Sequence, residues 1–335
     1  MTVLGLDIGG ANIKAATAAG WAMSVPFPLW KSPETLADAL SALIQQAGSV
    51  DVLAVTMTGE LADCFTTKAE GVARILASVQ AAAGDRRVSV WSTEGRFVTL
   101  VEANQHPFAV AAANWHALAT WVGHRFPYRS GLLIDIGSTT TDIIPLRNGI
   151  PCPLGKTDLS RLQSGELLYT GVRRTPLAAL MQTVLFRDEW VPTSSELFAT
   201  MLDVYLLRGD IPEDPCDTDT ANGRAATCAA ALDRIVRMLC ADRTEITEAE
   251  AIQMADQWAG QQLGYIQLSV QQVLRVLDAP CDTVFVSGSG EFLARRAIER
   301  IAELKSARVV SLTEVFTPAI AEAACAYSVA CLALP

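Results

Sequence analysis

Apolar residues along the chain fall into short continuous runs that alternate with longer stretches of mixed composition. The runs at 52–56, 88–91 and 283–286 predict buried parallel strands, because such strands are covered on both faces. Stretches with apolar residues at helical spacing predict helices at 33–47, 67–83, 104–121, 263–277, 291–305 and 319–334. Alternating strands and helices are typical of an α/β protein.

Two further apolar segments differ from these runs and resemble each other. Residues 4–14 and 132–142 each contain an apolar run, an aspartate, one more apolar residue and then a turn of glycine and small polar residues. Each continues into a second apolar run, so each predicts a β-hairpin. Asp7 aligns with Asp135 in this repeat. We therefore expect two related halves that face one cleft.

A break in the pattern indicates where the two halves divide. Pro127 and polar neighbours interrupt the apolar pattern across 123–130, which predicts a domain boundary there. The predicted first domain is 1–128 with 313–335, and the predicted second domain is 129–312 with a helical insertion over about 151–262.

Composition and charge narrow the classes of partner. The 335 residues are 50% hydrophobic and 19% charged, which is typical of a folded globular chain. The net charge of −10 argues against nucleic acid and anionic membrane surfaces as partners. Eight cysteines without a C-x-x-C pair, together with only three histidines, disfavour a zinc site or a disulfide framework and suit a reducing cytoplasm. No apolar run is long enough to predict a membrane span.

Three glycine-containing turns follow apolar strands, at 7–12, 135–141 and 287–290. Backbone at glycine can approach a phosphate closely and present several N–H groups to it. Asp7 and Asp135 begin two of these turns, which predicts one carboxylate from each half around a hydrated Mg²⁺. The predicted phosphate-binding residues are Gly9, Gly10, Ala11, Asn12, Gly137, Ser138, Thr139, Thr140, Thr141, Arg173 and Arg174.

These motifs, in this order, resemble the actin / sugar kinase / Hsp70 ATPase superfamily. The corresponding segments are 7–10 for its first phosphate loop, 55–59 for its first connection, 135–142 for its second phosphate loop, 286–290 for its adenosine motif and 319–330 for its second connection. The resemblance implies two actin-like, ribonuclease H-like domains with a cleft between them. Within the superfamily, Gly-Ser-Thr-Thr-Thr-Asp at 137–142 is similar to the hydantoinase A / oxoprolinase branch.

A shorter subfamily is similar in three further segments, 57–61, 113–115 and 165–176. Its members are linked to tetrahydromethanopterin-dependent C1 transfer, and one of their activities is ether formation in methanofuran biosynthesis. The resemblance implies a transferase that joins a furan-methyl diphosphate to a tyramine- or tyrosine-type phenol and releases diphosphate. It implies small-molecule substrates, with Mg²⁺ as the cofactor.

This chemistry assigns roles to the candidate residues. A phenol has a pKa of ~10 and needs a base, which Asp135, Asp142 or Glu60 could supply. Lys14, Arg173 and Arg174 are candidate cationic clamps on the diphosphate. The predicted catalytic residues are Asp7, Asp135, Asp142, Glu60 and Lys14, and the predicted substrate- or nucleotide-binding residues are Thr58, Gly59, Asn114, Gly288, Ser289 and Gly290.

Structural alternatives stay open for several of these residues. Lys14 could be an outward strand residue, and Asn114 could satisfy backbone groups at a helix junction. Adjacent side chains rarely face the same way, so at most one of Arg173 and Arg174 is expected to reach the ligand. The acidic loop at 210–219 lacks the spacing of a calcium loop and is expected to be solvated charge.

Functional alternatives also stay open. An ATP-dependent kinase, or a hydantoinase/oxoprolinase-like enzyme that activates an amide, would use the same turns for ATP, and a nucleotide-sensing protein would use them without turnover. A space for adenine below 288–290 would favour these alternatives, whereas filling by side chains such as Phe292 would favour the ether-forming transferase. The sequence leaves the oligomeric state open, a dimer included.

Overall fold

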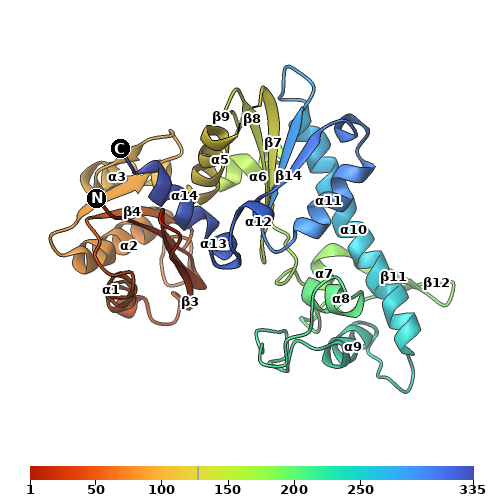
Figure 1. Cartoon of the computed structure of the whole chain (residues 1–335). Coiled ribbons are helices and arrows are strands. Elements are labelled where there is room, and N and C mark those ends of the chain that lie inside the picture. Colours follow the sequence, from red (N-terminus) through yellow and green to blue (C-terminus); the bar gives the residue numbers. More distant parts are fainter. Residues whose placement is uncertain (127) are drawn as a thin grey trace.

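The computed structural model describes residues 1–126 and 128–335, and it contains two large sheets with helices on their faces (Figure 1). Pro127, on which the predicted domain boundary rests, lies outside the described residues. The architecture is the predicted α/β arrangement of two actin-like domains. The bounds assigned to each domain remain a prediction.

The first sheet has the strand order β3-β2-β1-β4-β5-β6. Its strands are β1 (Val3–Ile8), β2 (Asn12–Thr17), β3 (Ala22–Pro26), β4 (Val52–Met57), β5 (Arg87–Trp91) and β6 (Phe97–Val98). Strands β1, β4 and β5 are parallel, whereas β2 and β3 form the antiparallel edge that the first repeat predicts. Helices α1 (Leu36–Gln46) and α2 (Lys68–Ala83) pack together against this sheet.

The second sheet has the order β10-β8-β7-β13-β14, with β9 paired to β8. Its strands are β7 (Ser130–Ile136), β8 (Thr141–Arg147), β9 (Ile150–Pro151), β10 (Leu167–Leu168), β13 (Thr283–Ser287) and β14 (Arg308–Ser311). Helices α10 (Glu248–Leu274) and α11 (Glu291–Arg300) pack against one face. No helix among the described residues has the length and apolar character needed to cross a membrane.

The remaining helices connect the sheets or cover their edges. They are α3 (Leu100–Gln105), α4 (Pro107–Val110), α5 (Asn114–Arg125), α6 (Asp158–Ser164), α12 (Leu312–Val315), α13 (Pro318–Glu322) and α14 (Ala324–Leu332). Helix α14 contacts both α5 and the strands β1, β2 and β4. The C-terminal stretch therefore returns to the first sheet and lies between the two halves (Figure 1).

Strand alternation decides where the first aspartate points. Side chains of successive strand residues project to opposite faces of a sheet. Leu4, Leu6 and Ile8 pack in the core with α1 and α2. Asp7 therefore lies on the other face with Val3, which packs against α5 and α14.

The second aspartate follows the same rule. Ile134 and Ile136 pack in the core with α10 and α11, whereas Leu133 packs with α5 and the start of α14. Asp135 shares the face of Leu133. Both aspartates therefore point to the side on which α5 and α14 join the two halves.

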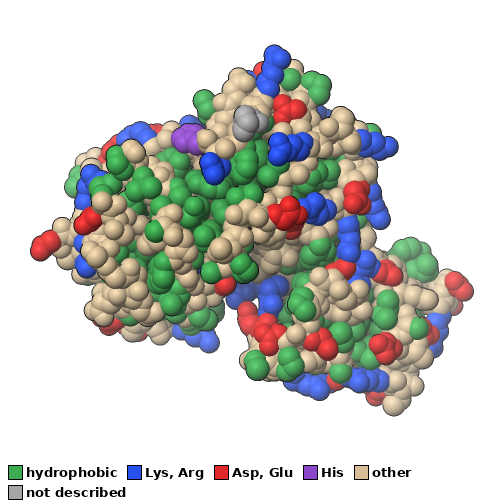
Figure 2. Space-filling view, viewed as in Figure 1, with side chains coloured by type: hydrophobic (Ala, Val, Ile, Leu, Met, Phe, Trp, Pro, Cys, Tyr) green, Lys and Arg blue, Asp and Glu red, His purple; other side chains and the backbone are tan. Residues whose placement is uncertain are grey.

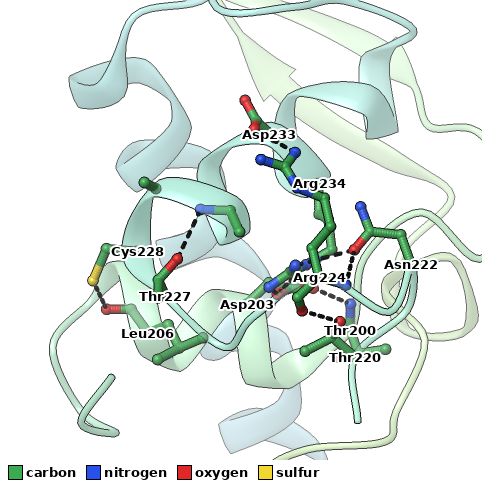
Figure 3. Close-up of polar contacts among 12 residues, drawn as sticks. Thr200, Asp203, Leu206, Thr220, Asn222, Arg224, Thr227, Cys228, Asp233 and Arg234 are labelled. Atoms are coloured by element: carbon green, nitrogen blue, oxygen red, sulfur yellow. Dashed lines mark hydrogen bonds and ion pairs between the residues drawn. The ribbon is translucent and has the colours of Figure 1, made fainter. Parts of the chain in front are cut away.

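The insertion forms a separate lobe at the lower right of Figures 1 and 2. It contains α7 (Leu177–Leu180), β11 (Thr183–Phe186), β12 (Glu189–Pro192), α8 (Met201–Leu207) and α9 (Cys228–Val236). Its centre holds an ion pair of two fully buried groups, Arg234 and Asp203, at 2.7 Å. Arg234 also donates to the Asn222 side chain at 3.2 Å, which ties the acidic loop to α9 (Figure 3).

Several predicted helices are interrupted. The predicted helix at 104–121 is divided into the end of α3, α4 and α5, because Pro107 lacks an amide hydrogen and begins a new helix, and because Ala112 has a φ of 46°. The predicted helix at 319–334 breaks at Ala323 into α13 and α14. The predicted helix at 33–47 begins with a 3₁₀ turn, Pro33–Thr35. The insertion is only partly helical, since β11 and β12 form a hairpin within it.

The contact between β1 and α14 predicts a specific loss of stability. A Cβ added at Gly5 would lie 1.8 Å from the Ala326 carbonyl oxygen, so Gly5→Ala should lower the free energy of unfolding by about 1–3 kcal/mol. Gly260→Ala is the matched control, because Gly260 lies inside α10 with nothing within 4 Å and alanine favours a helix by about 0.5–1 kcal/mol. Urea unfolding measures both; equal stability of Gly5→Ala and wild type would contradict the close contact.

Candidate active site

The two repeated turns have the same hydrogen bond. The Gly9 amide donates to the Asn12 carbonyl at 3.0 Å, and the Gly137 amide donates to the Thr140 carbonyl at 2.9 Å. The turns are therefore equivalent in backbone as well as in sequence.

The strands beside each turn place two charged residues opposite each other. Asp7 pairs with Lys14 across the first hairpin, and Asp135 pairs with Asp142 across the second. Directly opposed residues of antiparallel strands project from the same face. Lys14 therefore faces the cleft with Asp7 and is not an outward strand residue.

Two cavities meet at these residues. The larger has a volume of about 480 Å³ and the smaller about 390 Å³, and both are lined by Asp7, Lys14 and Asp135. Such volumes are typical of small-molecule sites. Predicted residues that line the larger cavity are Gly9, Gly10, Ala11, Asn12, Thr58, Glu60, Asn114, Gly137, Ser138, Thr139, Thr140, Asp142 and Arg174. Predicted residues that line the smaller one include Arg173, Arg174, Gly288 and Ser289.

Three predicted ligand-binding residues have structural contacts instead. Thr141 is fully buried, and its hydroxyl donates to the Thr170 carbonyl at 2.8 Å. The Gly59 amide donates to the Ile8 carbonyl at 3.0 Å, and the Gly290 amide donates to the Ile136 carbonyl at 2.8 Å. Gly59 and Gly290 therefore hold the ends of the aspartate-bearing strands in place.

Both arginines of the predicted clamp line the smaller cavity, although adjacent side chains rarely face the same way. The cause is the backbone: the amides of Arg173 and Arg174 both donate to the Ser138 carbonyl, at 3.1 and 2.9 Å. The 171–174 segment is thereby attached to the second phosphate turn. Adjacent side chains on this irregular segment can both face the cavity.

The acidic loop is solvated only in part, because Glu213, Asp214 and Asp219 are exposed whereas Asp210 and Asp217 are half-buried. Arg173 pairs with Asp217, and Arg174 pairs with Asp219 at 3.1 Å. Asp210, at the start of the loop, pairs with both Arg208 and Arg296. The loop therefore supplies counter-ions to the arginines beside the phosphate turn.

Asp7 is buried and Asp135 is half-buried, and loss of hydration disfavours their charged form. Burial raises the pKa of Asp7 to about 6, although Lys14 opposes the shift. Burial and the neighbouring Asp142 carboxylate raise the pKa of Asp135 to about 6. A cation beside both aspartates would favour their charged form.

Magnesium fits this position. Asp7 Oδ1 is buried and has no hydrogen-bond partner, which leaves it available to a ligand. No group of three or more histidine, cysteine, aspartate or glutamate side chains in the described part of the chain is arranged around a metal. Mg²⁺ commonly takes one or two protein carboxylates and completes its shell with water and substrate phosphate, so Asp7 and Asp135 are a sufficient protein contribution.

Glu60 combines burial with an unpaired oxygen. Its side chain is 1% exposed, it lines the larger cavity, and its Oε2 has no hydrogen-bond partner. Burial raises the pKa of Glu60 to about 7. A carboxylate with a pKa near neutrality is suited to accept a proton at physiological pH.

Asp142 has a different environment because Arg161 lies beside it, at 2.8 Å. Burial raises the pKa of Asp142, and Arg161 opposes the shift. Arg161 is 1% exposed, also donates to the Glu166 carbonyl at 3.0 Å, and lies over the Trp115 ring at 3.9 Å. One oxygen of Asp142 is thus committed to an ion pair, which makes Glu60 the better base.

Sequence analysis did not identify Arg161, although it lines the larger cavity. Helix α6 exposes its leucines, with Leu159 68% and Leu162 46% exposed, and buries its arginine. Hydrophobic periodicity predicts the opposite orientation, so no pattern in α6 points to this residue.

Comparison with known proteins identifies the family of this chain. Residues 51–333 match the family described as hydantoinase/oxoprolinase. The chain belongs to this family. The predicted resemblance is thereby confirmed. The nucleotide-free structure of acetone carboxylase superposes with a TM-score of 0.50 at 12% identity, over 91% of this chain and 49% of that chain, which is a likeness of fold.

Two curated proteins that are similar to this chain have the same name, (4-{4-[2-(gamma-L-glutamylamino)ethyl]phenoxymethyl}furan-2-yl)methanamine synthase. The protein of Methanocaldococcus jannaschii is 34% identical over 331 residues, which cover 98% of this chain and 96% of the relative. The protein of Methanococcus vannielii is 33% identical over 201 residues, which cover 60% of this chain and 89% of the relative.

The raised pKa of Glu60 predicts how stability depends on pH. The pKa rises from an ordinary 4.5 to about 7, so the neutral carboxyl stabilises the fold fully below pH 4.5 and this contribution is lost as the pH rises through 7. Glu60→Gln keeps the neutral shape at every pH. At about pH 8 the variant should exceed wild type by about 3 kcal/mol in free energy of unfolding, and near pH 4 the two should be equal. A difference between the proteins that does not change with pH would contradict the raised pKa.

Proposed function

We propose that the chain is a transferase that condenses a furan-methyl diphosphate with a tyramine- or tyrosine-type phenol to form an aryl ether in methanofuran-type cofactor biosynthesis. The observation that supports this most is the 34% identity with the Methanocaldococcus jannaschii synthase over 98% of this chain and 96% of the relative. That relative's name describes a phenoxymethyl group on a furan, which is the product of such a condensation.

Two cavities that meet at Asp7 and Asp135 suit a reaction of two substrates. The smaller cavity has Arg173 and the turn at Gly288 and Ser289, and it shares Arg174 and part of both phosphate turns with the larger one, so the junction of the cavities suits the diphosphate. The larger cavity has Glu60, so it suits the phenol. Proximity of two bound reactants is itself a large contribution to rate.

The proposed reaction forms one bond and breaks another. The phenolic oxygen forms a bond to the furan methylene carbon, and the bond from that carbon to the diphosphate oxygen breaks. Diphosphate leaves with the electron pair, and the phenolic proton passes to Glu60. Asp7 and Asp135 would hold Mg²⁺, which when bound supplies positive charge that stabilises the departing diphosphate.

The residues of the turns act on the leaving group. Backbone amides of both phosphate turns and the side chain of Lys14 are positioned to stabilise negative charge that increases as the bond breaks. Arg173 and Arg174 can add charge-assisted hydrogen bonds when the diphosphate replaces their aspartate partners.

Side chains pack just beyond the third turn, whereas the turn itself faces a cavity. Phe292 is half-buried, and its ring lies edge-on against Tyr205 with the ring centroids 4.9 Å apart. Arg296 lies over the same ring at 5.2 Å, and the Tyr205 hydroxyl donates to Gln262 at 2.5 Å. Phe292 therefore belongs to the packing around α10 and α11, and Gly288 and Ser289 line the smaller cavity.

The function is tested by turnover of the purified chain. Given Mg²⁺, a furan-methyl diphosphate and tyramine, the chain should release diphosphate and form the ether at equal rates, without ATP. Mass spectrometry detects the ether, and a coupled assay detects diphosphate. Absence of both products with tyramine, tyrosine and their γ-glutamyl derivatives would refute the proposal. Tight binding of Mg-ATP with substrate-stimulated release of ADP would support the kinase-type alternative.

The proposed base predicts a pH dependence. Wild-type kcat/KM should rise with pH until about 7, the pKa of Glu60, because only the charged carboxylate accepts the phenolic proton. Glu60→Gln should lower kcat by ~10²–10⁴-fold and remove this limb of the profile. Glu303→Gln is the control, because Glu303 is exposed and lines neither cavity. An unchanged profile in Glu60→Gln would assign the base to another residue.

A further inference from the structure

Three large apolar side chains line the larger cavity and yet face solvent. Trp30 is 43% exposed, Leu61 is 62% exposed and Tyr169 is 70% exposed. Trp30 follows β3 and Leu61 follows β4 in the first sheet, whereas Tyr169 follows β10 in the second. The outer part of this cavity therefore receives apolar surface from both halves of the molecule.

Core packing does not account for these side chains. The tryptophans that do pack in the interior are nearly closed to solvent, with Trp115 3%, Trp121 8% and Trp258 0% exposed. Scattered exposed apolar residues are common on proteins, but a group of them around one cavity is typical of a ligand site. These three side chains differ from other exposed apolar residues because all three line the cavity that contains Glu60.

Apolar lining, rather than charge, distinguishes the two cavities. Asp7, Lys14, Asp135 and Arg174 line both of them, and the smaller one also has Asp217 and Asp219. Trp30, Leu61 and Tyr169 line only the larger one. A neutral aromatic ring gains from burial against these apolar side chains.

We infer that Trp30, Leu61 and Tyr169 form the subsite that binds the aromatic ring of the acceptor. This inference rests on the proposed function and adds which residues select the acceptor. Leu61 and Glu60 both line the larger cavity, so a ring held against Leu61 lies in the same cavity as the proposed base. Trp30 and Tyr169 offer ring faces or edges to the same ring, and such aromatic pairs are specific in geometry.

The subsite predicts a selective defect in acceptor binding. Trp30→Ala and Tyr169→Ala should each raise the KM for tyramine by about tenfold, with the KM for the furan-methyl diphosphate unchanged. Trp30→Phe and Tyr169→Phe retain an aromatic ring and should restore most of the loss. Trp190→Ala is the matched control, because Trp190 is 67% exposed but lies on β12, in the insertion.

Titration calorimetry of tyramine binding gives a readout that does not depend on turnover. Wild type should bind tyramine, and both alanine variants should bind it about tenfold more weakly. Ether formation by wild type together with an unchanged tyramine KM in both alanine variants would overturn the subsite and leave the proposed function intact. No ether from wild type, with tyramine binding that still depends on Trp30 and Tyr169, would refute the proposed function and support the subsite. Absence of tyramine binding to wild type would overturn the subsite.

Discussion

Two carboxylates, one buried and one half-buried, lie where the two halves of the molecule meet, and the surrounding structure compensates for their charge. Asp7 and Asp135 lie on the faces that meet α5 and α14, because period-two alternation sends their apolar neighbours to the opposite cores. A buried carboxylate loses hydration and needs a positive partner. Lys14 and the glycine turns are near enough to supply part of it, and a metal ion with a phosphate ligand would complete the compensation. Fold and ligand class are thus linked through one electrostatic requirement.

The parts of the fold that depend on local pattern were predictable. The paired hairpins follow from short-range sequence, and so do the aspartates that begin each turn. Contacts between distant segments were not predictable: the buried Arg161 beside Asp142 reverses the hydrophobic pattern of its own helix. Thr141 belongs to the same run as its cavity-lining neighbours, but alternation turns it inward to Thr170. Sequence therefore predicted where the site lies better than which side chains reach it.

The site shows how one architecture can serve different reactions. The phosphate-binding turns act through backbone amides, so proteins that catalyse different reactions can share the turns and differ in the residues around them. In this chain these residues include a buried glutamate after β4 and an insertion that reaches the phosphate turn. The insertion has its own buried ion pair, Arg234 with Asp203, which holds it together away from the sheets (Figure 3). Substrate choice is thus separable from the phosphate-binding frame.

The acidic loop has a consequence for how an anionic product departs. Arg173 and Arg174 already have aspartate partners, so a diphosphate bound as proposed would displace Asp217 and Asp219 on entry. Binding is then an exchange of anions, and its net free energy is smaller than two unpaired arginines would provide. When the product leaves, the same aspartates return and no arginine is left without a counter-ion. The loop would therefore lower both the affinity for diphosphate and the barrier to its release, which suits the proposed release of diphosphate at every turnover.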